Sequence, residues 1–110
     1  MNSLVENSKP ALAELCRRFQ VRRLYLFGSG TGPRFDAKTS DLDFLVELSN
    51  RQPTKAYADR YLGLAESLER LFGRRVDLLT EQSIRNPFLR REVQATRQLV
   101  YEQRSEEAPV

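Results

Sequence analysis

Residues 26–48 read "LFGSGTGPRFDAKTSDLDFLVEL", and this stretch decides the fold. An apolar run ends at Gly28-Ser29, a polar loop follows, and a second apolar run opens with two aspartates. Branched and aromatic residues in both runs predict two strands. Because alternate residues of a strand point to opposite faces, Asp41 and Asp43 share one face. Two like charges at the start of a strand repel each other, so either water separates them or a cation lies between them.

The composition predicts one globular domain that spans residues 1–110 and has no membrane association. The chain has 110 residues, of which 40% are hydrophobic. Its apolar runs are shorter than the ~20 residues that span a bilayer, and the first residues lack the features of a signal peptide. A single cysteine, Cys16, cannot form an internal disulfide, which favours a reducing, cytoplasmic location.

The residue types that are absent exclude several chemistries. The chain has no histidine, which excludes Ser-His-Asp and Cys-His catalysis. One cysteine without histidine cannot build a structural zinc site, so a metal here would be a hard, oxygen-ligated ion such as magnesium. The basic residues form dispersed pairs without a continuous stripe or an aromatic platform, so we do not expect direct nucleic-acid binding.

The hydrophobic pattern of the whole chain predicts an α/β (α+β) fold, with a small mixed β-sheet flanked by helices. Thr54 can cap a long helix that Gly73 ends, and Asn86-Pro87 can start another. Cys16 lies on the apolar face of the first helix and is interpreted as a core residue. The predicted elements are a helix over 8–19 capped by Ser8 or Asn7, strands over 21–27, 41–48, 74–80 and 98–102, helices over 54–72 and from 86, and a frayed tail over 103–110.

The carboxylates fit a metal and phosphate site. Two carboxylates on one strand face can converge on a pair of cations about 3.5–4 Å apart, which in turn bridge the phosphates of a nucleoside triphosphate. Asp77, on a third predicted strand, can complete such a site and accept a proton from an attacking hydroxyl. A glycine at a strand end, as in Gly28-Ser29, lets backbone N–H groups approach a phosphate.

These motifs, in this order, resemble the minimal nucleotidyltransferase family of the DNA-polymerase-β-like nucleotidyltransferase superfamily. The resemblance covers most of the chain and rests on "LYLFGSG", "SDLDFLVEL" and "RVDLLTEQSIRNPFLRREV". It implies an antitoxin that transfers AMP from ATP to a tyrosine of a partner HEPN-domain toxin. It also implies that Asp41 and Asp43 bind two Mg²⁺ ions, and that Asp77 is the third ligand and the base.

The same resemblance implies that Gly28, Ser29 and Ser40 bind the nucleotide. The chain departs from the family pattern directly after Gly-Ser, where the family tends to have a basic residue. Here residues 30–33 are Gly-Thr-Gly-Pro, and Arg34 is the first basic residue. Loss of one phosphate contact costs on the order of 10²-fold in rate.

Two other functions stay open at this point. The first is a catalytically silent antitoxin that neutralises its toxin by binding alone, through the exposed side of the helix over 57–72 or the apolar residues after Asn86. The second is a nucleotidyltransferase that modifies an aminoglycoside-type hydroxyl, for which a partner subunit would have to supply the acceptor site.

Overall fold

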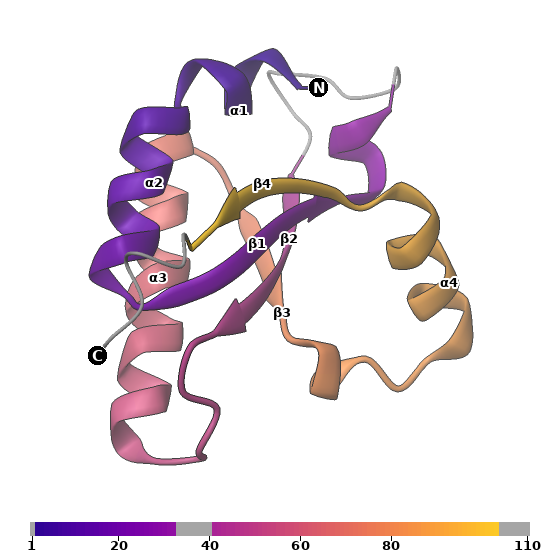
Figure 1. Cartoon of the computed structure of the whole chain (residues 1–110). Coiled ribbons are helices and arrows are strands. Elements are labelled where there is room, and N and C mark those ends of the chain that lie inside the picture. The colour runs from indigo at the N-terminus through magenta and orange to yellow at the C-terminus, as the bar shows by residue number, and fades with distance from the viewer. Residues whose placement is uncertain (1, 33–40, 104–110) are drawn as a thin grey trace.

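The strands form one sheet of four, in the order β3-β2-β1-β4, in a computed structural model that describes residues 2–32 and 41–103 (Figure 1). The strands are β1 (Val21–Phe27), β2 (Leu42–Leu48), β3 (Val76–Leu79) and β4 (Gln98–Glu102). β2 is antiparallel to β1. It is parallel to β3, because helix α3 (Lys55–Phe72) carries the chain from the end of β2 back to the start of β3. The predicted α+β class with a small mixed sheet is confirmed.

The larger hydrophobic core lies between the sheet and helices α2 (Lys9–Arg18) and α3, which lie side by side on one face (Figure 1). Leu42, Phe44 and Val46 of β2 point into this core, as the period of two predicts. Cys16 is fully buried in the same core, and burial raises the pKa of its thiol to about 12. The interpretation of Cys16 as a core residue is therefore confirmed.

Helix α3 begins and ends where the sequence predicts. Thr54 accepts a hydrogen bond at its Oγ1 from the N–H of Tyr57, at 3.2 Å. Gly73 ends the helix in the left-handed conformation, with φ of 62°. The hydroxyl of Tyr61 donates to the carbonyl of Leu78 and so connects α3 to β3. The contact from Tyr61 holds α3 against the edge strand that carries Asp77.

A smaller core lies on the opposite face of the sheet, under helix α4 (Pro87–Thr96) (Figure 1). Asn86 accepts hydrogen bonds from the N–H groups of the first turn of α4, which confirms the predicted helix start. Val93 of α4 is buried with Phe27 of β1 and Leu45 of β2. Because α4 covers only part of this face, the face holds both apolar contacts and exposed polar groups.

The N-terminal residues differ from the sequence-based expectation. A short helix, α1 (Ser3–Asn7), precedes α2 and places Val5 in the larger core. Asn2 caps α1 by accepting a hydrogen bond from the N–H of Leu4 at 2.8 Å. Ser8 occupies the position before α2, but its side chain makes no capping hydrogen bond. The predicted first helix is present as α2, but the predicted side-chain cap is wrong, because the chain is already helical in α1 as far as Asn7.

The C-terminal residues are described as far as Gln103. The N–H of Gln103 donates to the carbonyl of Arg22 at 2.8 Å, so the chain stays attached to β1 just beyond β4. The rest of the predicted tail, residues 104–110, lies outside the described residues. Within residues 2–32 and 41–103, no helix combines the length and the apolar character needed to cross a membrane.

Two leucines of α3 test the position of the larger core. Leu64 is fully buried and Leu62 is 59% exposed, although only one residue separates them. We expect Leu64→Ala to lower the free energy of unfolding by about 2–5 kcal/mol, because it leaves a cavity. The matched Leu62→Ala should change it by less than about 0.5 kcal/mol. Urea unfolding measures both, and equal losses would contradict the packing of α3.

Candidate active site

Asp43 and Asp77 face each other across the parallel strands β2 and β3, as partners in the register. They lie on the face opposite the larger core, because their neighbours Phe44 and Leu78 are buried in that core. The pKa of Asp43 is raised from 3.8 to about 6. Burial is the largest cause, followed by the charge of Asp77 and a hydrogen bond between the two side chains. The structure thus brings together two of the three predicted carboxylates.

Asp41 is close to this pair without being part of it. It lies one residue before β2 begins, and its side chain is exposed. Its charge contributes to the raised pKa of Asp43, after the contributions of burial and of Asp77. In the part of the chain that is described, no three acidic side chains are arranged to hold a metal ion. Repulsion between the carboxylates favours this separation when no cation is present.

Gly28 lies directly beside Asp43. It begins the 3₁₀ turn η1 (Gly28–Thr31) after β1, and its φ of +73° is in the region that favours glycine. A Cβ atom at this position would lie only 3.0 Å from Oδ2 of Asp43. Only glycine therefore lets the backbone approach the carboxylate of Asp43 this closely. Ser29 follows within η1, and Ser40 lies outside the described residues.

Three side chains hold the η1 turn in place. The N–H of Gly28 donates to Oγ1 of Thr96 at 2.9 Å, and Oγ1 of Thr31 donates to the carbonyl of Gly28 at 2.7 Å. Nδ2 of Asn2 donates to the carbonyl of Gly30 at 3.1 Å. The N–H of Gly28 is therefore already bonded within the protein. What Gly28 offers a ligand is its backbone conformation and its missing side chain.

Sequence reasoning missed Thr96, Asn2 and Glu92. The charge of Glu92, on α4, is the last contribution to the raised pKa of Asp43. No local pattern marks these residues, because their contacts form only when α1 and α4 fold back against the sheet. The one available signal was the prediction of a helix after Asn86, which places Glu92 and Thr96 on the same element.

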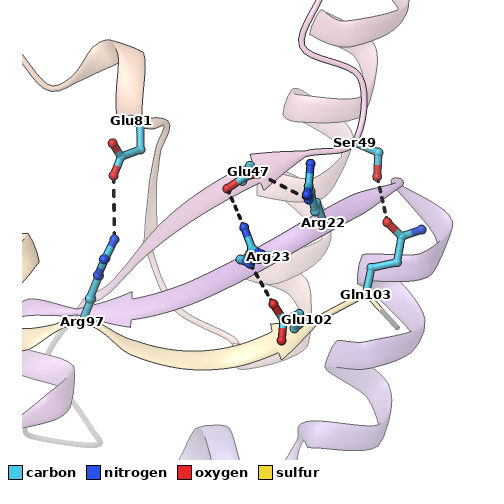
Figure 2. Close-up of polar contacts among 8 residues, drawn as sticks. All are labelled: Arg22, Arg23, Glu47, Ser49, Glu81, Arg97, Glu102 and Gln103. Carbon is cyan, nitrogen blue, oxygen red and sulfur yellow. Dashed lines mark hydrogen bonds and ion pairs between the residues drawn. The ribbon is translucent and has the colours of Figure 1, made fainter. Parts of the chain in front are cut away.

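Three glutamates elsewhere on this face have basic partners. Figure 2 shows ion pairs that join Glu47 and Glu102 to Arg23, and Glu81 to Arg97. By contrast, Asp43 forms no ion pair within the described residues, and Asp77 has only Arg75, at 4.0 Å. Negative charge at this pair is thus compensated only by the long contact of Asp77 with Arg75, and such a charge attracts a cation.

The donor set fits a hard divalent cation. All the candidate ligands are carboxylates, and oxygen ligands of this type suit Mg²⁺ or Mn²⁺. Asp43 and Asp77 already lie within hydrogen-bonding reach of each other, and the backbone of Gly28 lies next to Asp43. These residues therefore fit a metal and the phosphates that it would carry.

Comparison with known proteins decides the family. Residues 9–100 match the family model described as "Nucleotidyltransferase domain". The chain belongs to the nucleotidyltransferase domain family. A protein of Methanocaldococcus jannaschii named "Putative protein adenylyltransferase" is 35% identical to this nucleotidyltransferase domain over 78 residues, which cover 70% of this chain and 74% of that protein.

Solved structures share the fold of this nucleotidyltransferase domain. A structure described as a putative minimal nucleotidyltransferase has a TM-score of 0.62 and 29% identity, and the match covers 89% of this chain and 95% of that one. A toxin–antitoxin structure with AMP-PNP has a TM-score of 0.62 and 22% identity, covering 90% and 77%. A complex of the tri-AMPylated HEPN toxin of Shewanella oneidensis with its MNT antitoxin has a TM-score of 0.61 and 19% identity, covering 94% and 76%.

The raised pKa of Asp43 predicts a pH-dependent stability in the metal-free protein. Because the folded state raises this pKa from 3.8 to about 6, folding favours the protonated carboxyl. Its contribution to stability is therefore complete below about pH 4 and is lost as the pH rises through about 6. The Asp43→Asn variant has no carboxyl to ionise here, so its stability does not fall in this way. It should therefore gain stability relative to the wild type between pH 4 and pH 7.5. Urea unfolding with a chelator measures the difference, and an equal difference at both pH values contradicts the expectation.

Proposed function

We propose that this nucleotidyltransferase domain transfers AMP from ATP, with Mg²⁺, to a tyrosine hydroxyl of a HEPN-domain toxin and thereby acts as its antitoxin. The observation that carries the proposal is the pair Asp43–Asp77, with the backbone of Gly28 packed closely against Asp43. We assign this pair as the site for cations and phosphates on the nucleotidyltransferase fold. We place the reaction in the cytoplasm, in agreement with the single, unreactive Cys16.

The relatives support the choice of reaction and partner. The Methanocaldococcus jannaschii protein is named as a protein adenylyltransferase, which fits AMP as the group transferred and a protein as the acceptor. Two structural neighbours are toxin–antitoxin structures, one with the ATP analogue AMP-PNP and one with an AMPylated HEPN toxin. These names motivate the assignment of ATP as the substrate and of a HEPN toxin as the partner.

In the proposed site, Asp41, Asp43 and Asp77 would hold two Mg²⁺ ions, and Gly28, Ser29 and Ser40 would hold the triphosphate. When bound, the ions offset the charge of the triphosphate and of the pyrophosphate that leaves. Asp41 is exposed at the start of β2, so its side chain can turn toward Asp43 once a cation removes the repulsion.

The transfer itself needs a base and a correctly placed acceptor. The tyrosine oxygen forms a bond to the α-phosphorus of ATP, the bond to the bridging oxygen breaks, and pyrophosphate leaves with that electron pair. Asp77 is half-exposed at the edge strand β3, so a tyrosine of a docked protein can reach it. We assign Asp77 as the base that accepts the phenolic proton.

The second candidate is an antitoxin that acts by binding alone. It is favoured by the run Gly30-Thr31-Gly32, which has no basic residue where the family tends to place one. Phe88 at the start of α4 is 75% exposed, and such an aromatic side chain is suited to an interface. The two candidates predict the same complex but differ in whether label is transferred.

A transfer assay with α-labelled ATP and Mg²⁺ tests the proposal. The purified chain is mixed with the product of the neighbouring gene, and label on that protein is measured. We expect transfer by the wild type and a loss of at least on the order of 10²-fold for Asp41→Asn with Asp43→Asn, because the metal ligands are removed.

Asp59→Asn is the matched control, because it removes an exposed carboxylate on α3 that pairs with Lys55. It should transfer label at the wild-type rate. A stable complex that shows no labelling from any of the four nucleotides would overturn the catalytic proposal and leave the binding antitoxin.

A further inference from the structure

The η1 turn is held by residues that come from opposite ends of the chain. Asn2 holds the carbonyl of Gly30, and Thr96 holds the N–H of Gly28. Of these two contacts, the one from Thr96 is closer to the carboxylates, because a Cβ on Gly28 would lie 3.0 Å from Oδ2 of Asp43. The orientation of the Gly28 peptide therefore affects the space in which a phosphate would lie.

Thr96 can make this contact because of its place at the end of α4. Its hydroxyl donates to the carbonyl of Glu92, one turn back, at 2.8 Å. This bond fixes the direction of the hydroxyl hydrogen, so a lone pair of Oγ1 is free to accept from Gly28. One hydroxyl thus joins the last turn of α4 to the first residue of η1.

We infer that Thr96 is a positioning residue for the nucleotide: its hydroxyl holds the Gly28–Ser29 turn in the conformation that the triphosphate needs. The inference rests on the proposed function, and it adds a residue that lies outside the Gly-Ser and Asp-x-Asp motifs. Thr96 does not touch the reacting atoms. It acts through Gly28, which has a left-handed φ of +73°. Gly28 follows Phe27, the last residue of β1, so the hydrogen bonds of the sheet do not hold this conformation.

A merely structural role would give a different result from a positioning role. As a structural residue, Thr96 would only hydrogen-bond backbone groups at the end of α4. The loss of its hydroxyl would then lower stability without changing the kinetic constants. As a positioning residue, its loss changes how well ATP is held and aligned. A displacement of about 1 Å in an active site can cost on the order of 10²-fold in rate.

Thr54 offers a matched control for the loss of a hydroxyl. Its Oγ1 also accepts a backbone N–H at a helix end, that of Tyr57, at 3.2 Å. It lies at the start of α3, and none of its contacts involves η1 or the carboxylates. Thr54→Val and Thr96→Val therefore remove the same kind of hydrogen bond at two different places.

The experiment measures kcat and KM for ATP in the labelled transfer assay, together with thermal unfolding, for four proteins. These are the wild type, Thr96→Val, Thr96→Ser and Thr54→Val. We expect Thr96→Val to lower kcat/KM by about 10–100-fold, mostly through a higher KM. Thr96→Ser keeps the hydroxyl and should stay within about threefold of the wild type. Thr54→Val should unfold at a lower temperature with unchanged kinetic constants.

If Thr96→Val keeps the wild-type kinetic constants, the positioning role is overturned. If the wild type transfers no label, the proposed reaction fails, and Thr96 is then judged by calorimetric binding of AMP-PNP with Mg²⁺. In that case an affinity about tenfold lower for Thr96→Val supports the inference, and an equal affinity overturns it. A wild type that neither transfers label nor binds AMP-PNP would overturn both proposals.

Discussion

The site depends on the register of the parallel pair β2–β3, which sets Asp43 opposite Asp77. A shift of one residue would turn Asp77 toward the larger core and expose Val76 and Leu78, which are buried there. The hydrophobic core therefore holds the two carboxylates together despite their repulsion, which is visible in the raised pKa of Asp43. The packing of α3, through Leu64 and Leu68, maintains this register.

The two faces of the sheet differ in how far helices cover them. One face is closed by α2 and α3 and supplies most of the apolar burial, whereas the other is only partly covered by α4 (Figure 1). On the second face Arg23 and Arg97 neutralise nearby glutamates (Figure 2), while Asp43 has no basic partner among the described residues. Negative charge with little compensation is therefore concentrated where β2 and β3 begin, beside the η1 turn.

The sequence predicted the elements well because each carries a local signal. Thr54 and Gly73 mark the two ends of α3, and Asn86 marks the start of α4. The alternation of apolar and polar residues around Asp43 predicts the face of the sheet on which it lies. The sequence also suggested Asp77 as a neighbour of Asp43, since Asp77 lies on a further predicted strand that could be adjacent. The contacts of Asn2 and Thr96 with η1 could not be predicted, because they join residues distant in sequence. Metal binding by Asp41, Asp43 and Asp77 stays a prediction, and so does nucleotide binding by Gly28, Ser29 and Ser40.

The most direct test of the central claim is thermal unfolding of the wild type and Asp77→Asn, with and without Mn²⁺ plus AMP-PNP. Without the ligands, removal of the repulsion should make Asp77→Asn at least as stable as the wild type. With the ligands at a hundredfold excess over Kd, the wild type should gain about 2.7 kcal/mol and Asp77→Asn much less. Equal gains for both proteins, or no gain for the wild type, would contradict a site built on Asp43 and Asp77.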